Sequence, residues 1–272
     1  MVPSANSRAR RAFGQNLLAD RAVARHLADL AGDNELLYEV GAGRGRLTAE
    51  LLARCAHVVA YEIDAGLAAR LPGHPRLSVR TSDFLAAEPP AGDFAVAGNI
   101  PYALTAAVVR WCLHAPTLRR AALLTQWEYA RKRSGDYGRW SRLTVLTWPE
   151  FSWRLAGRVP RTAFRPAPRV DGGILLLERR PAALVGPGRM PAWQRLVETG
   201  FTGTGGSLMA TLTHRYGERR AWAAARAARL GPETPVGAVW PEQWLTLFAL
   251  LEERPGPVRP GAGTTSAGRR RR

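Results

Sequence analysis

The segment from residue 36 to residue 55 constrains the fold of this chain more than any other. Leu36–Val40 is a short apolar run that predicts a buried strand. It leads into a loop with glycines at Gly41, Gly43 and Gly45, and a helical pattern follows over residues 47 to 55. Glycines allow tight turning and close backbone approach to a ligand, and a helix N-terminus favours negative or polar groups. A strand, glycine loop and helix in this order predict an α/β nucleotide-binding fold.

The spacing of the glycines separates two kinds of nucleotide site. A dinucleotide fingerprint requires glycine at position 46, where this chain has Arg46. The acidic-x-Gly-x-Gly-x-Gly pattern that opens at Glu39 is more typical of S-adenosylmethionine sites. Glu62 lies about 20 residues past the first glycine, after an apolar run over His57–Tyr61, where an acidic side chain accepts hydrogen bonds from ribose hydroxyls. A lone glutamate would ordinarily be a surface residue, but at this position we expect Glu62 to bind the ribose of that cofactor.

A third apolar run, Leu77–Arg80, is followed by Asp83 and Phe84. We expect Asp83 to accept a hydrogen bond from the adenine amine of the cofactor, with the Phe84 ring beside the adenine. The alternative is that Asp83 only shapes an Asx-type turn, a common role for aspartate after a strand. The glycine loop and Glu62 upstream favour the binding role.

An amide and an aromatic ring follow the fourth apolar run, residues 94 to 97. Pro101 cannot donate to a sheet ladder, so the strand should end near it. Asn99 and Tyr102 then lie at the carboxyl edge of the sheet, where open α/β folds bind ligands. The Asn99 amide oxygen and a nearby backbone carbonyl can accept from an amine, and the Tyr102 ring can stack on a base. The alternative is a proline-terminated strand with an ordinary turn.

A further aromatic residue, Phe164, opens a proline-stiffened loop over residues 164 to 170. We expect Phe164 to face the target base, opposite or edge-on to Tyr102. Asn99, Tyr102 and Phe164 are therefore the expected catalytic residues. We expect no metal at this site.

The remaining patterns divide the chain into segments. We expect a Rossmann-like domain over residues 13 to 180, with Asp20 capping its first helix. A Pro/Gly/Ala-rich linker precedes a small helical domain over residues 190 to 253, which we expect to bind RNA. The arginine-rich ends, residues 1 to 12 and 254 to 272, cannot build a core and are expected to be disordered. Later strands of the sheet are expected at residues 121 to 126, 143 to 148 and 174 to 178.

The charge of the chain points to a polyanionic partner. The formal net charge is +17, and nearly all of the basic residues are arginine. Codon bias explains arginine over lysine, but it does not explain the excess of base over acid. We therefore favour nucleic acid over a membrane surface, because no basic amphipathic helix stands out.

Five residues around one expected helix end are candidates for RNA contact. Arg131, Lys132 and Arg133 close a predicted helix, and Arg139 and Trp140 lie in the polar, aromatic loop that follows. Basic residues interleaved with aromatic rings suit single-stranded nucleic acid. The alternative is a solvated loop whose aromatic rings fold back onto the core.

Other features bound the location of the protein. No apolar run approaches the ~20 residues that a membrane helix needs, and the N-terminus carries no apolar signal core. Cys55 and Cys112 each sit in an apolar helical pattern without metal-ligand spacing. We expect a cytoplasmic protein that does not bind a membrane.

Six motifs spread over residues 10 to 250 resemble the ribosomal RNA adenine dimethylase family. The motifs are Gln15-Asn16-x-Leu18, Glu39-x-Gly41-x-Gly43-x-Gly45, Tyr61-Glu62-Ile63-Asp64, Ser82-Asp83-Phe84, Asn99-Ile100-Pro101-Tyr102 and Phe164-x-Pro166-x-Pro168-x-Val170. Within that family, the segments 131 to 133 and 135 to 141 and the arginine-rich tail resemble the Erm macrolide-resistance methyltransferases, most closely those of antibiotic-producing actinomycetes. One departure is Leu17, where the family usually has phenylalanine; we expect it to change packing over the cofactor only slightly.

The resemblance implies an S-adenosylmethionine-dependent methyltransferase that modifies one adenine in the peptidyl-transferase region of 23S rRNA and confers macrolide-type resistance. It places the cofactor contacts at Asn16, Leu18, Gly41, Gly43, Glu62, Asp83 and Asn99, of which Asn16 and Leu18 rest on the resemblance alone. We expect a monomer that acts before ribosome assembly is complete. Competing interpretations are a housekeeping dimethylase of small-subunit rRNA, a DNA adenine methyltransferase and a binding-only relative. The intact glycine loop and Asn-Ile-Pro-Tyr motif argue against the last.

The arginine-rich tail generates a prediction. Its arginines should neutralise phosphates without reading sequence, so deleting residues 254 to 272 should weaken RNA binding at low salt. The slope of log K against log salt should flatten by about 0.7 for each single-strand phosphate that the tail no longer neutralises. The target adenine should not change. Equal salt slopes for the full-length and truncated proteins would show that the tail is inert.

Overall fold

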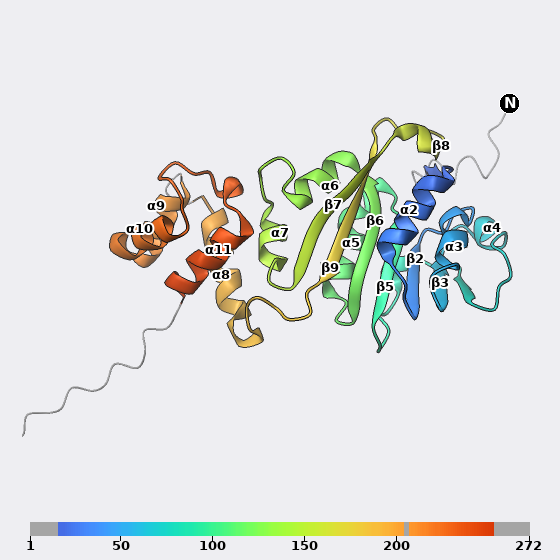
Figure 1. The fold of residues 1–272 in the computed structure, drawn as a ribbon, viewed down its shortest axis with the longest axis horizontal. Coiled ribbons are helices and arrows are strands. Elements are labelled where there is room, and N and C mark those ends of the chain that lie inside the picture. The colour runs from blue at the N-terminus through green and yellow to red at the C-terminus, as the bar shows by residue number, and fades with distance from the viewer. Residues whose placement is uncertain (1–15, 204–206, 253–272) are drawn as a thin grey trace, which may run out of the picture.

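The computed structural model describes residues 16–203 and 207–252 (Figure 1). At its centre is a seven-stranded sheet with five parallel strands, then one antiparallel strand, then an edge strand that runs in the same direction as the first five. In spatial order the strands are β4 (Leu77–Arg80), β3 (His57–Tyr61), β2 (Leu36–Val40), β5 (Phe94–Asn99), β6 (Leu118–Gln126), β9 (Gly172–Arg179) and β7 (Phe151–Val159). This sheet confirms the predicted α/β fold. The expected basic ends, residues 1 to 12 and 254 to 272, lie outside the described residues.

The strand order fixes where a ligand can bind. The chain runs outward from β2 through β3 to β4, and then returns to β5 on the other side of β2. The connections that leave β2 and β5 therefore diverge from neighbouring strand ends. Such a reversal opens a crevice at the carboxyl ends of the strands. The glycine loop follows β2 and the Asn-Ile-Pro-Tyr motif ends β5, so both meet at this crevice.

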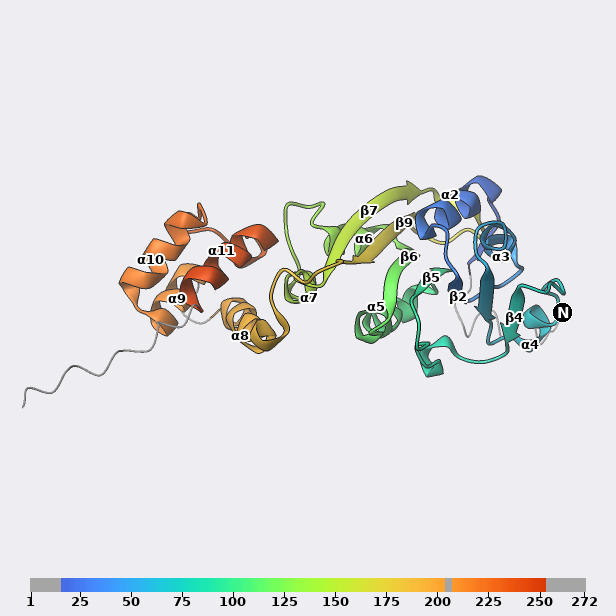
Figure 2. The same cartoon turned by 60° about the horizontal axis from the view of Figure 1, so that its bottom comes forward.

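Helices cover both faces of the sheet, and Figure 2 shows α2 and α3 on one side with α5 on the other. Alternating strand residues supply both cores: Ala95 and Ala97 of β5 face α2 and α3, while Phe94 and Val96 face α5. The covering helices are α2 (Arg21–Ala31), α3 (Arg46–Leu51), α5 (Thr105–His114) and α6 (Trp127–Ser134), with a short α4 (Ala65–Ala68) near the β4 edge.

A small second sheet lies over the crevice. Here β1 (Leu17–Leu18) pairs antiparallel with β8 (Phe164–Arg165), which joins two segments far apart in sequence. The chain then turns into α2 after Asp20, whose side chain accepts from the amides of Ala22 and Val23 at 2.8 and 3.2 Å. The predicted Asp20 cap is confirmed, and this cap holds β1 at the start of the first helix.

One expected strand is wrong. Residues 143 to 147 lie in a helix, α7 (Arg142–Thr147), residue 148 caps its end, and the true strand is β7 (Phe151–Val159) further along the chain. The Ser141 hydroxyl caps α7 by accepting from the Thr144 amide at 3.2 Å. Such a cap satisfies one of the unpaired N–H donors in the first turn of a helix. The β-branched residues of this short run favour a strand when read alone, so the run itself gave no sign of the helix.

The C-terminal helices build a separate core beyond α7. They are α8 (Met190–Phe201), α9 (Leu208–Tyr216), α10 (Glu218–Ala227) and α11 (Pro241–Leu251). Trp193 and Trp244 fill this core, and Trp140 and Val145 from the α7 region join it. The Trp193 indole also donates to the Leu146 carbonyl at 3.0 Å. This packing anchors the helical unit on α7. Among the described residues, no helix has the length and apolar character needed to cross a membrane.

The close approach of β5 to β2 generates a prediction. A Cβ added at Gly98 would lie 2.6 Å from the Val40 carbonyl oxygen, which is backbone and cannot move aside cheaply. Gly98→Ala should therefore destabilise the fold by about 1–3 kcal/mol, as measured by urea unfolding. Gly92→Ala is the matched control, because nothing lies within 4 Å of its added Cβ. Equal unfolding midpoints for the two variants would contradict the tight contact.

Candidate active site

A cavity of about 220 Å³ opens at the carboxyl ends of β2, β3 and β5. Seven of the predicted site residues line it: Asn16, Gly41, Gly43, Glu62, Asp83, Asn99 and Tyr102. Leu18 and Phe164 do not line it. The remaining walls are largely apolar, with Val40, Tyr61, Phe84 and Leu85 among them. A mostly apolar cavity with a few placed polar groups suits a small organic ligand.

The glycine loop closes one end of this cavity through backbone bonds. The amides of Gly41 and Ala42 both donate to the Tyr61 carbonyl, at 2.9 and 3.2 Å. Gly41 and Gly43 have φ angles of 69° and 58°, and a Cβ added at Gly43 would meet the Leu17 side chain at 3.0 Å. Glycine tolerates this left-handed backbone without steric cost, so the loop can fold tightly against its neighbours.

Glu62 ties the loop to the next strand. Its side chain is 2% exposed, and its two oxygens accept from the amides of Gly43 and Asp64 at 2.8 and 2.9 Å. Each carboxylate oxygen has a second lone pair, so Glu62 can still accept from a ligand in the cavity. Two oxygens held side by side suit the paired hydroxyls of a ribose.

Glu39 is a site residue that the prediction did not single out. Its side chain is 1% exposed; one oxygen accepts from the Thr48 hydroxyl at 2.6 Å, and the other has no partner among the described residues. Burial, assisted by the nearby Glu62 charge, raises the pKa of Glu39 to about 7. A hollow of about 20 Å³ that Glu39 shares with Gly41 and Asn99 adjoins the cavity. An ammonium group of a ligand would satisfy the unpaired oxygen. The signal in the sequence was the acidic residue that opens the glycine pattern.

Asp83 shapes a turn and also lines the cavity. One oxygen accepts from the Leu85 amide at 2.9 Å and shapes the turn, while the residue also lines the cavity. Phe84 is buried and lies edge-on to Tyr61, with ring centroids 5.5 Å apart. Because a carboxylate has two oxygens, Asp83 can hold the turn and accept from an adenine amine beside these rings.

Asn99 and Tyr102 line the cavity where β5 ends. Asn99 is the last residue of β5, and its amide nitrogen donates to the Asn16 carbonyl at 2.7 Å. That bond orients the amide so that its oxygen is available as an acceptor. Tyr102 opens a short 3-10 turn after Pro101, and its hydroxyl is buried without a partner among the described residues. Burial, assisted by the charge of Asp171, raises the pKa of Tyr102, so the phenol stays neutral.

Comparison with known proteins agrees with this geometry. The profile of the family described as ribosomal RNA adenine dimethylase matches residues 6–253. The chain belongs to this family. Relatives include an rRNA methyltransferase of Streptomyces thermotolerans, 50% identical over 91% of this chain and 85% of that protein, and an rRNA adenine N-6-methyltransferase of Streptomyces fradiae, 51% identical over 93% and 81%. The crystal structure of the 23S rRNA methyltransferase ErmE is 45% identical and matches with a TM-score of 0.85, covering 88% of this chain and all of that one.

The expected role of Phe164 in this dimethylase-family chain is not what the structure shows. Phe164 is fully buried in β8, within the same core as Leu18 of the paired β1 and Val159. Its ring therefore does not face the cavity. Leu18 likewise lies in that core and faces the smaller hollow behind the loop, while its neighbour Leu17 lines the cavity. Both residues position the strand pair that covers the crevice.

The expected RNA-binding residues fall into two groups. Trp140 is 7% exposed and packs edge-on against Trp148, so the alternative of a ring folded onto the core is the one observed. Arg133 is half-buried and donates to the Ser141 hydroxyl at 2.7 Å. Lys132 and Arg139 are exposed.

Arg131 is engaged within the protein. Its guanidinium lies 3.7 Å from the Tyr137 ring centroid and is paired with the Asp136 carboxylate at 2.5 Å. These contacts brace the loop after α6. Lys132, in the last turn of α6, and Arg139, in that loop, are exposed. Of the five predicted contacts, these last two are the ones left without a protein partner among the described residues.

The pKa of Glu39 generates a prediction. The unfolded carboxyl titrates near 4.5 and the folded one at about 7. The native state therefore holds a proton that the unfolded state releases. The stabilisation that this proton gives to the native state is complete below pH 4.5 and is lost as the pH rises through 7. Relative to Glu39→Gln, the wild-type protein should lose up to about 3 kcal/mol of unfolding free energy across that window, measured by urea unfolding at several pH values.

Glu88→Gln, at an exposed carboxylate, is the matched control. It should follow the pH dependence of the wild-type protein. Parallel curves for wild type and Glu39→Gln would show that Glu39 does not hold the proton.

Proposed function

We propose that this protein transfers methyl from S-adenosylmethionine to the exocyclic amine of one adenine in the peptidyl-transferase region of 23S rRNA, and so confers resistance to macrolide-type antibiotics. The observation that carries the proposal is the Asn99 amide, fixed by Asn16 beside Tyr102 at one end of the cavity. The relatives named rRNA adenine N-6-methyltransferase and the similarity to the 23S enzyme ErmE support this substrate.

The cavity residues fit the proposed cofactor from one end to the other. Asp83 and the rings near Phe84 suit its adenine, Glu62 suits its ribose, and the unpaired Glu39 oxygen suits its ammonium group. Asn16, Gly41 and Gly43 close the remaining wall, and Leu18 supports that wall from the core. When bound, S-adenosylmethionine supplies an electrophilic methyl on a positively charged sulfur.

Asn99 is assigned the role of making the adenine amine more nucleophilic. The adenine amine is a poor nucleophile because its lone pair is delocalised into the ring. The two N–H groups of the amine donate hydrogen bonds to the Asn99 oxygen and to a backbone carbonyl, and this arrangement favours a tetrahedral nitrogen. The Pro101 carbonyl already accepts from the Leu104 amide at 2.8 Å, so we assign the second acceptor to the Ile100 carbonyl. The rate gain then comes from positioning and electrostatics, with no strong base in the attack step.

Tyr102 holds the target base in place. Its ring lines the cavity beside Asn99 and offers a face on which an adenine can stack. The base must leave its own stack first, which costs less in a loop than in a duplex. Because Phe164 is buried, we do not assign it the role of a second stacking face for the adenine. We assign it a role in supporting the β1–β8 pair.

The wider context of the reaction completes the proposal. We assign RNA phosphate contacts to the exposed Lys132 and Arg139, braced by Arg131 and Arg133, while Trp140 joins the helical unit to α7. The helical unit gives the RNA a second surface. We place the protein in the cytoplasm as a monomer that acts on rRNA before ribosome assembly is complete.

The decisive experiment uses labelled cofactor with protein-free 23S and 16S rRNA from an unmethylated strain. Label in 23S rRNA alone, a primer-extension stop at one adenine and reduced macrolide susceptibility of expressing cells would support the proposal. Label in 16S rRNA alone would assign the chain to small-subunit modification. Label in neither RNA would mark it as a binding protein.

Two variants divide the work of the site. Tyr102→Ala should lose stacking worth ~1–3 kcal/mol and lower kcat/KM on an RNA fragment by the corresponding factor, whereas Tyr102→Phe should keep most of it. Glu62→Ala should instead weaken cofactor binding, measured by calorimetry, and leave RNA affinity largely intact. An unchanged kcat/KM for Tyr102→Ala would remove the stacking role.

A further inference from the structure

A second hollow, of about 340 Å³, lies on the other side of β1 from the cavity. Four arginines from three parts of the chain line it: Arg21, Arg44, Arg46 and Arg165. The one acidic residue in the lining is Glu50. None of these five residues lines the 220 Å³ cavity. The hollow is therefore a strongly cationic site apart from the residues assigned to the cofactor.

The charge of this hollow is not balanced within the described chain. Glu50 pairs with Arg21 at 2.8 Å and with the neighbouring Arg25 at 3.5 Å, and these arginines lower the pKa of Glu50. No carboxylate of residues 16–203 or 207–252 lies within ion-pair distance of Arg44, Arg46 or Arg165. Guanidinium groups gathered in one concavity repel one another, and an anion bound among them removes that repulsion.

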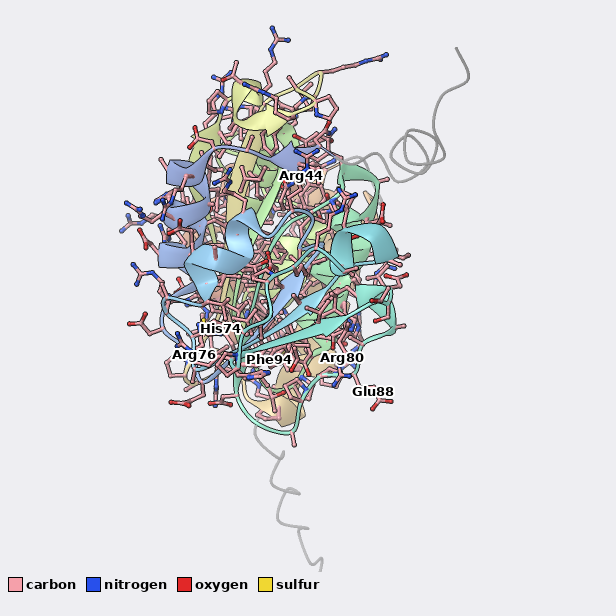
Figure 3. The ribbon with its side chains drawn as sticks, turned by 90° about the vertical axis from the view of Figure 1, so that its right-hand side faces the viewer. Arg44, His74, Arg76, Arg80, Glu88 and Phe94 are labelled. Atoms are coloured by element: carbon pink, nitrogen blue, oxygen red, sulfur yellow. The ribbon has the colours of Figure 1, made fainter. Side chains whose placement is uncertain are left out.

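The backbone places these side chains with some precision. Arg44 stands between two left-handed glycines, Gly43 and Gly45, so the same turn that closes the cavity projects Arg44 outward. Figure 3 shows Arg44 apart from Arg76 and Arg80, which lie lower in the view. Arg165 of β8 is oriented by two bonds of 2.8 Å that it donates to backbone carbonyls, those of Thr162 and Phe164.

The hollow adjoins the proposed reaction site. Leu17 of β1 lines both the arginine hollow and the cavity that holds Asn99 and Tyr102. The small hollow behind the glycine loop also connects the two, because Arg44, Arg46 and Asn99 all line it. A strand of RNA whose adenine enters the cavity therefore passes close to the arginines as it crosses β1.

We propose that this arginine hollow binds a backbone phosphate of the RNA near the target adenine, an inference that rests on the proposed function. Guanidinium groups bind phosphate oxygens through paired, charge-assisted hydrogen bonds. A phosphate fixed here sets the register of the RNA on the protein, so that one adenine and not its neighbours reaches Asn99. The site thus contributes to positioning as well as to affinity.

The first test compares salt dependence. Arg44→Gln/Arg46→Gln should flatten the slope of log K against log salt for a 23S rRNA peptidyl-transferase-loop fragment by about 0.7, the value for one phosphate, so wild type should lose about 2.6-fold more affinity than the variant between 50 and 200 mM salt. Arg76→Gln/Arg80→Gln removes two exposed arginines that lie apart from Arg44 and should leave the slope unchanged. Arg44→Lys/Arg46→Lys should restore most of it. Circular dichroism verifies that each variant is folded.

The second test locates the phosphate. Neutral methylphosphonates are placed singly along the fragment, and the affinity of each is measured with wild type and with Arg44→Gln/Arg46→Gln. The proposal predicts one or two positions near the target adenine where neutralisation weakens wild-type binding and has no further effect on the variant. Additive effects at every position would overturn it.

The outcomes separate this inference from its foundation. If wild type methylates 23S rRNA but the double variant keeps the wild-type salt slope, the arginine hollow is not a phosphate site and the proposed function stands. If the variant instead loses cofactor affinity, the arginines serve the cofactor, which also overturns the inference. If inorganic phosphate displaces the labelled RNA fragment from wild type at the same concentration as unlabelled fragment does, the hollow is a site for a free anion, and this too overturns the inference. If wild type transfers no methyl to any rRNA, the proposed function itself fails.

Discussion

The hydrogen bond from the Gly43 amide to the Glu62 carboxylate is the contact on which the rest of the site depends. It joins the loop after β2 to the end of β3, and the second Glu62 oxygen secures the backbone at Asp64. With the loop closed in this way, Gly41 lines the cavity, Glu39 stays buried behind it and Arg44 projects to the other side. A single carboxylate thus shapes both the proposed cofactor site and the arginine hollow.

A second constraint comes from outside the central sheet. Asn99 ends a strand, but its amide is oriented by the Asn16 carbonyl, just before β1. β1 in turn is held by β8 and by the Asp20 cap of α2. The orientation of the amide therefore depends on pairing between segments almost 150 residues apart, across register partners such as Leu18 and Phe164. This explains why the fully buried Phe164 ring matters to the site without touching the cavity.

The sequence predicted the parts of the fold that rest on local patterns. The bounds of β2, β3 and β4 were predicted in full, since short apolar runs before turn-forming residues leave little choice. The position of Glu62 followed from the end of β3. Asn99 followed from an apolar run predicted to end at residue 97, two residues short of the end of β5. The strand predicted at residues 143 to 148 was wrong because a short run rich in β-branched residues shows no clear hydrophobic periodicity. The cap at Ser141 favours a helix there. The roles predicted for Phe164 at the target base and for Trp140 in RNA contact do not match the structure, in which both rings are buried. Their burial depends on distant partners, here Leu18 and the Trp148 region, that local sequence does not reveal.

The structure also bears on the excess of arginine. Composition alone left open whether these residues reflect codon bias or a polyanionic partner. In the described chain, arginines such as Arg54, Arg119 and Arg120 pair with carboxylates of neighbouring elements and so add no field of their own. Arg44 and Arg46 have no such partner among the described residues, and both lie next to the crevice. Arg44 and Arg46 lie close to Asn99, at the turn that Glu62 closes. This placement suits a turn that holds a cofactor on one side and attracts a phosphate backbone on the other.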